Sequence, residues 1–459
     1  MKFMDKSNIS ESNQGDLAIE QALGWAAGTL GCLREAFAAG RRRDEPWEIA
    51  RVPEERQPAM AQAAAVFRRG VGVAGVESAA YRPAEILSTR SVAEALALVP
   101  GSYGLSESQG GAIPGRFLFV VDEAITRLWP EFRESHLGFP AWILRGGEAV
   151  KNLETASRLT AWIRSHSGSA DRGLQVVAIG GGVTLDVAGF AAGLCGLEHV
   201  NIPTTLLAMV DAAIGGKTGV NFPPFGKNQV GLFHFPARVI ICPDFLRTLP
   251  VEEIRAGAAE CLKHALLAGD LDFFEKWVRL ARDGNAAFAE DGGPVVVVTR
   301  MKEAFVERDP FELSGARELL NLGHTTAHAL ESVAQSRGLV IRHGAAVAMG
   351  LACKVRLMAA AQPGCLGLAR KIMDALRSSR CVDEVIAWLS GPDIAMDAVW
   401  AAMVDQMRQD KKLRSGDRTG IRVVGLRWNP ATGILEAHAT EVELEALRRA
   451  FVSCLQELR

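Results

Sequence analysis

Histidine and glutamate residues in the second half of the 459-residue chain have the spacing of a metal site. His324 and His328 are four residues apart, which places both side chains on one face of a helix. His343 follows at the start of another apolar stretch, and Glu260 lies on an earlier one, three residues before Lys263. Two histidines and a carboxylate with one open position form the common catalytic zinc arrangement, although a structural histidine pair is the alternative. The HxxxH spacing lacks the Glu of an HExxH helix, so peptidase chemistry is not indicated.

Three consecutive glycines, residues 180–182, end one apolar run and open a helical stretch. Such a turn lets backbone N–H groups approach a pyrophosphate at a helix N-terminus, where the helix dipole favours anions. Asp122 and Glu148 end two neighbouring strands, where the ribose hydroxyls of a dinucleotide usually meet carboxylates. The pattern indicates a dinucleotide site or, alternatively, a tight turn without a ligand.

Lysine is scarce in this chain, with 12 Lys against 39 Arg. Lys is a compact charge whose pKa moves easily, whereas Arg is a rigid fork that stays charged, so each Lys in a Gly-rich segment is a candidate for chemistry. Lys217 and Lys227 lie in such a segment, which we expect to form Gly-rich turns, and Asn228 follows the second. Paired lysines there suit a multiply anionic ligand such as a phosphate or carboxylate. The alternative is a solvent-exposed loop.

The composition is that of a globular protein from a reducing compartment. Basic residues number 51 and acidic residues 53, a net charge of -2, which argues against a general nucleic-acid or membrane-surface binder. No run approaches 18 uninterrupted apolar residues, and acids precede any apolar stretch at the N-terminus, so we expect neither a membrane span nor a secretory signal. Eight cysteines without a CxxC pair are expected to be free thiols, which favours the cytoplasm.

The chain is expected to divide into three segments. Residues 1–80 are rich in Ala and Arg and are interpreted as an extension with one or two helices. Residues 81–250 alternate helical stretches with strands expected at 116–123, 140–148, 173–182, 199–205 and 238–244. This alternation predicts crossover connections and a Rossmann-like α/β domain with a parallel sheet. Residues 251–459 are predicted to form a mostly α-helical domain, with helices at 251–269, 273–284, 294–309, 324–335, 345–360 and 441–458.

Several motifs closely resemble those of 3-dehydroquinate synthase and its sugar phosphate cyclase relatives. They read GGGVTLDVAGFAA, IPTTLLAMVDAAIGGKTGVN, GKNQVGLFHFP, LRTLPVEEIRAGAAECLKHAL, ARELLNLGHTTAHALE and RHGAAVAMG. The resemblance covers about residues 116–415 in order and leaves 1–80 unexplained. It implies an NAD-binding α/β domain, a helical metal- and substrate-binding domain and a homodimer that acts on a small molecule, with no nucleic acid or membrane partner.

The resemblance also implies roles for individual residues. The ligands of Zn2+, or of another divalent cation such as Co2+, correspond to Glu260, His324 and His343. The NAD contacts correspond to Asp122, Glu148, Lys151, Gly181, Gly182, Asp186, Thr204, Thr205, Asp211 and Thr248. The catalytic positions correspond to Lys217, Lys263, Asn228, Arg317, Asn321 and His328. Further substrate contacts correspond to Lys227, Lys302 and Lys411 or Lys412. Seven of the 12 lysines thus fall on site positions, which agrees with their scarcity elsewhere.

The implied activity is that of a phosphate-eliminating carbon–oxygen lyase in the shikimate pathway of aromatic amino acid biosynthesis. In that family NAD+ oxidises a ring hydroxyl, phosphate leaves by β-elimination, the ketone is reduced again, and the ring opens and closes in an intramolecular aldol reaction. The metal stabilises oxyanion charge, lysines neutralise the substrate's anions, and His328 is the candidate for proton transfer. The expected reaction converts 3-deoxy-arabino-heptulosonate 7-phosphate to 3-dehydroquinate and phosphate.

Some features depart from the family pattern. Residues 191–196 lack the Arg that the family uses for phosphate, and His199 or an Arg from elsewhere is a possible replacement. Ala345 stands where Glu is usual, which removes an expected partner of the metal site. Lys217 and Lys227 are one residue further apart than usual, and the N-terminal extension is atypical. These departures suggest a specialised cyclase.

Other functions therefore stay open. The acid substrate is favoured because Lys302, Arg317, Asn321 and the pair Lys411 and Lys412 resemble the acid-binding set of dehydroquinate synthase. Cyclisation of sedoheptulose 7-phosphate or another sugar phosphate in secondary metabolism is the first alternative. A metal-dependent polyol dehydrogenase and a catalytically silent relative are the others.

Overall fold

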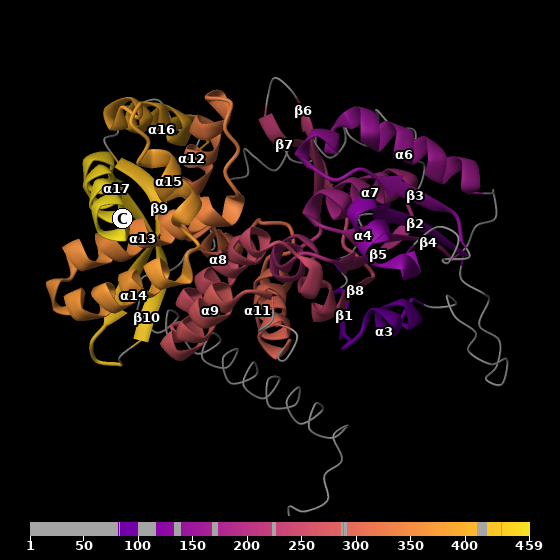
Figure 1. Ribbon diagram of the computed structural model, residues 1–459, viewed down its shortest axis with the longest axis horizontal. Coiled ribbons are helices and arrows are strands. Elements are labelled where there is room, and N and C mark those ends of the chain that lie inside the picture. The colour runs from indigo at the N-terminus through magenta and orange to yellow at the C-terminus, as the bar shows by residue number, and fades with distance from the viewer. Residues whose placement is uncertain are drawn as a thin grey trace, which may run out of the picture.

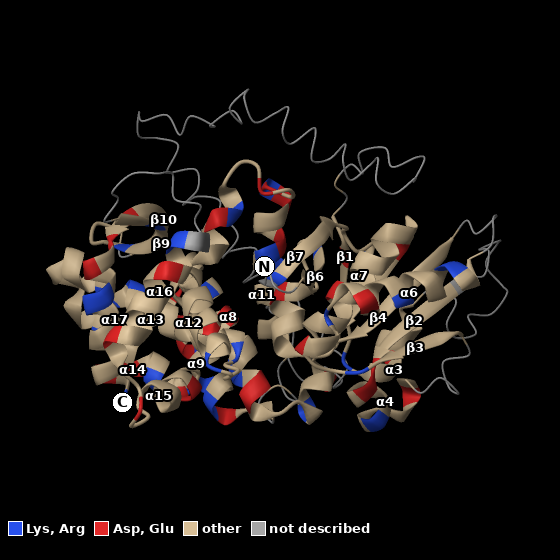
Figure 2. Cartoon of the chain, turned by 90° about the horizontal axis from the view of Figure 1, so that it is seen from above, with Lys and Arg blue, Asp and Glu red and all other residues tan. Residues whose placement is uncertain are grey.

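The computed structural model describes residues 81–459 apart from 82, 100–115, 133–138, 168–172, 223–225, 286–287, 289–291, 411–419 and 433. The predicted extension, residues 1–80, and the predicted substrate contacts Lys411 and Lys412 lie outside the described residues. An α/β half and a mostly helical half lie side by side (Figure 1). Basic and acidic residues are interspersed over both halves in Figure 2, in keeping with the nearly balanced charge.

Six parallel strands form the central sheet, as the alternation of strands and helices predicts. They are β1 (Glu85–Ser88), β2 (Arg116–Asp122), β3 (Ala141–Leu144), β4 (Leu174–Gly180), β5 (Glu198–Pro203) and β8 (Arg238–Ile241), in the order β1-β8-β5-β4-β2-β3. Val177, Ala178 and Ile179 on β4 are completely buried, since helices cover a parallel sheet on both faces. All five expected strands are present, and β1 adds an edge strand.

The chain reverses its course across this sheet between β2 and β4. From β2 it passes to the edge strand β3, returns to pair β4 with the other side of β2, and continues outward through β5 to β8. Open α/β sheets bind ligands in the crevice at the carboxyl ends of the strands at such a reversal. Asp122 and the glycine triplet lie at this reversal.

Short helices follow the strands of the sheet. They are α3 (Val92–Ala97), α4 (Glu123–Leu128), α6 (Leu153–His166) and α7 (Gly182–Cys195), with single turns at Pro130–Phe132, Glu148–Val150, Ala208–Ala212 and Pro243–Thr248. Helix α7 starts directly after β4 and ends at Gly196, which takes the left-handed conformation that glycine favours at a helix C-terminus. The tight strand-to-helix connection puts the N-terminus of α7 at the crevice.

The segment expected to form Gly-rich turns is instead a β-hairpin. Strands β6 (Lys217–Phe222) and β7 (Gly226–Phe233) pair antiparallel, with an irregular register between Val220 and Phe222. A methyl group on Gly219 would lie 2.8 Å from Val230 O, so this glycine serves the close pairing of the strands. Glycines in this segment therefore obscured a strand pattern. In Figure 1 the hairpin stands above the junction of the two halves.

The second half is mostly helical, as predicted. Its helices are α8 (Val251–Ala268), α9 (Leu271–Asp283), α11 (Gly293–Arg308), α12 (His324–Ser336), α13 (His343–Ala361), α14 (Leu366–Ser379), α15 (Asp383–Leu389), α16 (Met396–Asp410) and α17 (Leu444–Leu458), with turns at Ala316–Asn321 and Pro363–Cys365. An antiparallel hairpin, β9 (Gly420–Asn429) and β10 (Ile434–Glu443), was not predicted.

Helix α13 is the central helix of this half. It packs on α8, α12, α14 and α17, and from Gly344 to Val355 every residue is buried. It is also the one helix among the described residues that is long and apolar enough to cross a membrane, with a mean hydropathy of 1.4 over 18 residues. Because 78% of that window is buried inside the protein, the apolar composition is that of a core helix.

Candidate functional site

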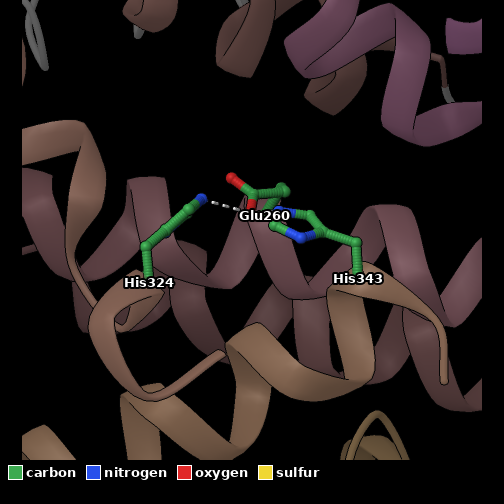
Figure 3. A group of neighbouring side chains, drawn as sticks. All are labelled: Glu260, His324 and His343. Carbon is green, nitrogen blue, oxygen red and sulfur yellow. Dashed lines mark ion pairs between the residues drawn. The ribbon is translucent and has the colours of Figure 1, made fainter. Parts of the chain in front are cut away.

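Glu260, His324 and His343 lie together, each from a different helix (Figure 3). Glu260 is on α8, and the two histidines are the first residues of α12 and α13. Glu260 Oε1 lies 3.6 Å from His324 Nε2 and 3.5 Å from His343 Nε2. A tetrahedral zinc with bonds of about 2.1 Å separates its ligand atoms by about 3.4 Å. The three atoms are therefore spaced as ligands of one divalent cation.

Two glycines of α13 bring the three helices this close. A methyl group on Gly344, the residue after His343, would lie 1.9 Å from Ala256 O, one turn before Glu260 on α8. A methyl group on Gly350 would lie 2.0 Å from the carbonyl oxygen of the residue that precedes His324. Since real Cβ atoms do not approach backbone oxygens so closely, any side chain at either glycine would move the helices apart.

Of the two carboxylate oxygens of Glu260, one contacts a lysine and the other faces the two histidines. Glu260 is completely buried, its Oε2 contacts the Lys263 ammonium, and its Oε1 faces the Nε2 atoms of His324 and His343. Burial alone would raise the pKa of Glu260, but the charge of Lys263 and then that of His324 hold it well below its usual range. Glu260 is thus ionised, as a metal ligand must be.

The two histidines differ in protonation. Burial, and then the Lys263 ammonium, lower the pKa of His324 well below its ordinary value, so its imidazole is neutral. Burial also lowers the pKa of His343, but hydrogen bonds to Glu260 and Glu331 outweigh it and raise this pKa to about 10. A cation at Glu260 would therefore displace a proton from His343.

The predicted partner of His324, His328, lies beside the triad rather than in it. Its ring centroid is 5.4 Å from that of His324 and 6.1 Å from that of His343. His328 is exposed. His328 is thus close enough to both rings for the expected proton transfer, which stays a prediction.

Five of the expected cofactor residues lie at the carboxyl ends of β2, β4 and β5. Asp122 begins α4, where its Oδ1 accepts a hydrogen bond of 2.8 Å from Ala124 N. Gly181 and Gly182 begin α7, and a methyl group on Gly181 would lie 3.2 Å from Thr205 Cγ2. Thr204 donates its N–H to Gly180 O at 3.0 Å, which ties the turns after β4 and β5 together.

The other expected cofactor residues pair with neighbours around this edge. Lys151 forms a buried ion pair with Asp186, although burial still raises the pKa of Asp186 above its ordinary value. Glu148 accepts a hydrogen bond of 2.7 Å from Asn221 Nδ2. Thr248 Oγ1 accepts one of 3.2 Å from Trp129 Nε1, and Asp211 is bound by a lysine from α11. These contacts therefore fix the orientations of the expected cofactor residues.

The hairpin carries three of the expected substrate residues. Lys217 begins β6 and contacts the carboxylate of Glu312, while Lys227 on β7 has its Nζ 3.9 Å from Glu331 Oε1. Asn228 adopts a φ of 54°, and its N–H donates to Asn221 Oδ1 at 2.9 Å. Asn221 thereby links Glu148, an expected cofactor contact, to Asn228, an expected substrate contact.

The remaining expected substrate residues come from α11 and the turn before α12. Lys302 is buried on α11 and binds Asp211. Arg317 is 4% exposed, and its Nη1 donates to Gly215 O at 3.2 Å and Pro310 O at 2.9 Å. Asn321 is exposed two residues before the α12 N-terminal cap. All three come from the helical half, and Arg317 lies near Lys217 of the hairpin, since both contact Glu312.

His199 does not replace the missing phosphate-binding Arg. It is on β5, completely buried, with its ring stacked on His234 at a centroid distance of 4.7 Å. A substrate phosphate has no access to such a ring. Arg164 of α6 reaches the same segment, where its Nη2 donates to Leu194 O at 3.4 Å.

Two acidic residues that the sequence interpretation missed contact the expected site. Glu331 accepts a hydrogen bond from His343, and Glu312 contacts Lys217. Glu331 follows His328 by three residues on the same helix face, which is a signal that could have been used. The seven cysteines within the described residues are free thiols, as predicted.

Comparison with known sequences places most of the chain in one family. Residues 141–256 match the family model for the 3-dehydroquinate synthase N-terminal domain, and residues 257–413 match that for the C-terminal domain. The 3-dehydroquinate synthase of Pyrobaculum neutrophilum is 38% identical over 321 residues, which cover 68% of this chain and 85% of that protein.

Solved structures share the fold at lower identity. ValA, a 2-epi-5-epi-valiolone synthase from Streptomyces hygroscopicus subsp. jinggangensis 5008 with NAD+ and Zn2+ bound, is similar with a TM-score of 0.64 and 24% identity, over 84% of this chain and 99% of its own. A 2-deoxy-scyllo-inosose synthase complexed with carbaglucose-6-phosphate, NAD+ and Co2+ has a TM-score of 0.59 and 19% identity, over 80% of this chain and 96% of its own.

Proposed function

Because the chain belongs to the 3-dehydroquinate synthase family, we propose that it is a sugar phosphate cyclase that depends on NAD and a divalent metal. The proposed reaction converts 3-deoxy-arabino-heptulosonate 7-phosphate to 3-dehydroquinate and phosphate. The observation that carries the proposal is the convergence of one buried carboxylate and two imidazoles on a single point. We further propose that the enzyme works as a cytoplasmic homodimer.

The residues present fit both cofactors. Glu260, His324 and His343 would hold Zn2+ or Co2+, since an ionised carboxylate and imidazole nitrogens at this spacing are suitable ligands. The N-terminus of α7, with Gly181 and Gly182, would hold the NAD pyrophosphate. The other NAD contacts would be Asp122, Glu148, Lys151, Asp186, Thr204, Thr205, Asp211 and Thr248. The solved relatives of the same fold carry NAD+ with Zn2+ or Co2+, which supports this assignment.

When bound, NAD+ would accept and return a hydride, and the metal would polarise the substrate oxygen that undergoes oxidation. The chain's own residues bind and orient the substrate. Lys263 is buried against Glu260, so its positive charge would stabilise oxyanion charge that develops beside this carboxylate. Exposed His328 adjoins both ligand rings and would move the proton at that oxygen.

The substrate's anionic groups would meet cations from both halves of the chain. Lys217, Lys227 and Asn228 on the hairpin are assigned to the phosphate side. Lys302, Arg317 and Asn321 are assigned to the carboxylate side, together with Lys411 or Lys412. Holding the substrate between the two halves would fix the leaving phosphate relative to the metal and the nicotinamide.

The test is a substrate panel in which phosphate and NADH are followed together. With NAD+, Zn2+ and 3-deoxy-arabino-heptulosonate 7-phosphate, we expect stoichiometric phosphate release and a carbocyclic product without net NADH. Accumulation of NADH from polyols would instead identify a dehydrogenase. The absence of phosphate release from any seven-carbon sugar phosphate would reject the cyclase proposal.

Cyclisation of sedoheptulose 7-phosphate is the second candidate. Residues 191–196, which lack the expected phosphate-binding Arg, and Ala345 depart from the family pattern and so favour a specialised cyclase. Because both substrates carry a phosphate, the choice between them rests on recognition of the carboxylate. Faster turnover of sedoheptulose 7-phosphate than of the acid substrate would select this function.

A further inference from the structure

Glu331 contacts one expected metal ligand, His343, and one expected substrate residue, Lys227. It lies on α12, seven residues after His324, and its side chain is 16% exposed. Its Oε2 is 3.1 Å from His343 Nδ1, within hydrogen-bond distance. Its Oε1 is 3.9 Å from Lys227 Nζ on the β6–β7 hairpin, which is beyond hydrogen-bond distance. The two carboxylate oxygens thus have different partners.

The contact to His343 has the geometry that orients a metal-binding imidazole. His343 Nε2 faces Glu260 Oε1, while its Nδ1 faces Glu331 on the opposite side of the ring. An imidazole that donates its Nδ1–H to a carboxylate has its Nε2 lone pair free and fixed in direction for a cation. His324 has a weaker arrangement of the same kind, with its Nδ1 3.3 Å from the carbonyl oxygen of Leu322.

Glu331 also supplies a carboxylate partner that Ala345 cannot provide. The sequence comparison leads us to expect that the metal site lacks a carboxylate partner, because Ala345 stands where Glu is usual. Ala345 is 4% exposed on α13, whereas the carboxylate that meets His343 comes from the neighbouring helix α12. The partner is therefore present but is supplied from a different element.

We propose that Glu331 is the positioning residue that holds His343 in the tautomer and orientation required of a metal ligand. This inference rests on the proposed function, because it assumes a cation at Glu260, His324 and His343. Glu331 itself touches neither the cation nor the substrate in this arrangement. Its contribution is to metal affinity, through the direction of the His343 lone pair.

The experiment measures Zn2+ affinity directly, by competition with a chromophoric chelator after the metal has been stripped. Glu331→Ala is expected to weaken binding about 10–100-fold, the usual effect of removing an outer partner of a ligand. Glu331→Gln retains an oxygen that can accept the Nδ1–H and should recover most of the affinity. Co2+-loaded Glu331→Ala should also show a visible absorption spectrum different from that of the wild type.

Two controls separate positioning from loss of charge or stability. Glu436→Gln on β10 removes a comparable partly buried ion pair, that with Arg427, and should leave Zn2+ affinity unchanged. Lys227→Met removes the cation from the other oxygen and should change the affinity less than about 3-fold, as expected for an exposed pair beyond hydrogen-bond distance. Equal losses in Lys227→Met and Glu331→Ala would show a charge effect and overturn the proposal.

The outcomes also separate this proposal from the proposed function. If the wild type binds no Zn2+ or Co2+, the metal-dependent function fails. If the wild type binds one ion tightly and Glu331→Ala binds it equally well, only the role of Glu331 fails. Two ions per wild-type chain with loss of one in Glu331→Ala would make Glu331 a ligand, which also contradicts the positioning role.

Discussion

Lys302 on α11 donates two hydrogen bonds to Asp211, one to the carboxylate Oδ1 at 2.6 Å and one to the carbonyl oxygen at 2.5 Å. Asp211 belongs to the turn after β5, so the pair joins the helical half to the α/β half at the crevice. Burial alone would raise the pKa of Asp211, but the charge of Lys302 outweighs it, and the pKa falls to about 2. The pair is therefore ionised at neutral pH.

Removing one partner of this pair should destabilise the protein. Asp211→Ala leaves the buried Lys302 ammonium without its carboxylate, and we expect a loss of about 2–3 kcal/mol in the free energy of unfolding. The value lies below the range of about 3–5 kcal/mol for fully buried pairs because the Asp211 side chain is 31% exposed. The double variant Asp211→Ala/Lys302→Met should be more stable than Asp211→Ala alone in urea unfolding. A double variant with the sum of the two single losses would show that the pair is not coupled.

The two close-approach glycines of α13 should be intolerant of alanine. Gly344→Ala and Gly350→Ala force the new methyl group against backbone oxygens of α8 and of the residue before α12, so each should cost about 1–3 kcal/mol. The same displacement separates the ligands, and Zn2+ affinity should fall with stability.

The matched control is Gly367→Ala on α14, where a methyl group meets nothing within 4 Å. It should be neutral or stabilise by up to about 1 kcal/mol, since alanine is the better helix former. Thermal unfolding with and without Zn2+ measures both effects. Unchanged Zn2+ affinity in both α13 variants would contradict the role of these glycines.

The sequence was sufficient for five of the six strands of the central sheet, and its family resemblance was sufficient for the grouping of Glu260, His324 and His343. Apolar runs separated by helical stretches favour a parallel sheet, whereas helix spacing alone pairs His324 with His328, which lies beside the group. That the three residues hold a metal stays a prediction. The hairpin β6–β7 was missed because glycines such as Gly219, which permit close pairing, also resemble turn residues.

The partners of the charged residues could not be read from local spacing. Glu331 meets His343 only because α12 and α13 cross closely, and this crossing depends on Gly350 against the residue before His324. Likewise, Glu312 reaches Lys217 across more than 90 residues of sequence. The hydrophobic periodicity of a sequence indicates on which face of a helix or strand a side chain lies, whereas contacts between elements depend on tertiary packing.

Glu312 should compete with the substrate for its cations. Its Oε1 contacts Lys217 and lies 3.4 Å from Arg317 Nε, and both cations are assigned to substrate anions. Exposed pairs contribute about 0.2–1 kcal/mol, so Glu312→Gln should tighten competitive inhibition by inorganic phosphate by up to about 5-fold. Weaker inhibition in the variant would show that Glu312 assists anion binding instead.

The stability of the protein should decrease in mild acid because of a buried histidine pair. His199 is completely buried beside His234, and neither of its ring nitrogens hydrogen-bonds to a described residue. Burial, and then the charge of His234, lower the pKa of His199 well below 6.5, and burial lowers that of His234 as well. Below about pH 6.5 the unfolded chain therefore binds protons that the folded chain does not.

This difference in proton binding determines how stability changes with pH. The full contribution to stability is present above about pH 6.5 and is lost as the pH falls toward the lowered pKa values of the folded state. His199→Phe keeps a stacked aromatic ring without a titrating group. As the pH falls, the free energy of unfolding of this variant should therefore decrease less steeply than that of the wild type, with a difference in slope of roughly 1 kcal/mol per pH unit. Urea unfolding at pH 7, 6 and 5 measures the slope. An equal slope in His199→Phe and wild type would mean that this imidazole stays accessible to protons in the folded protein.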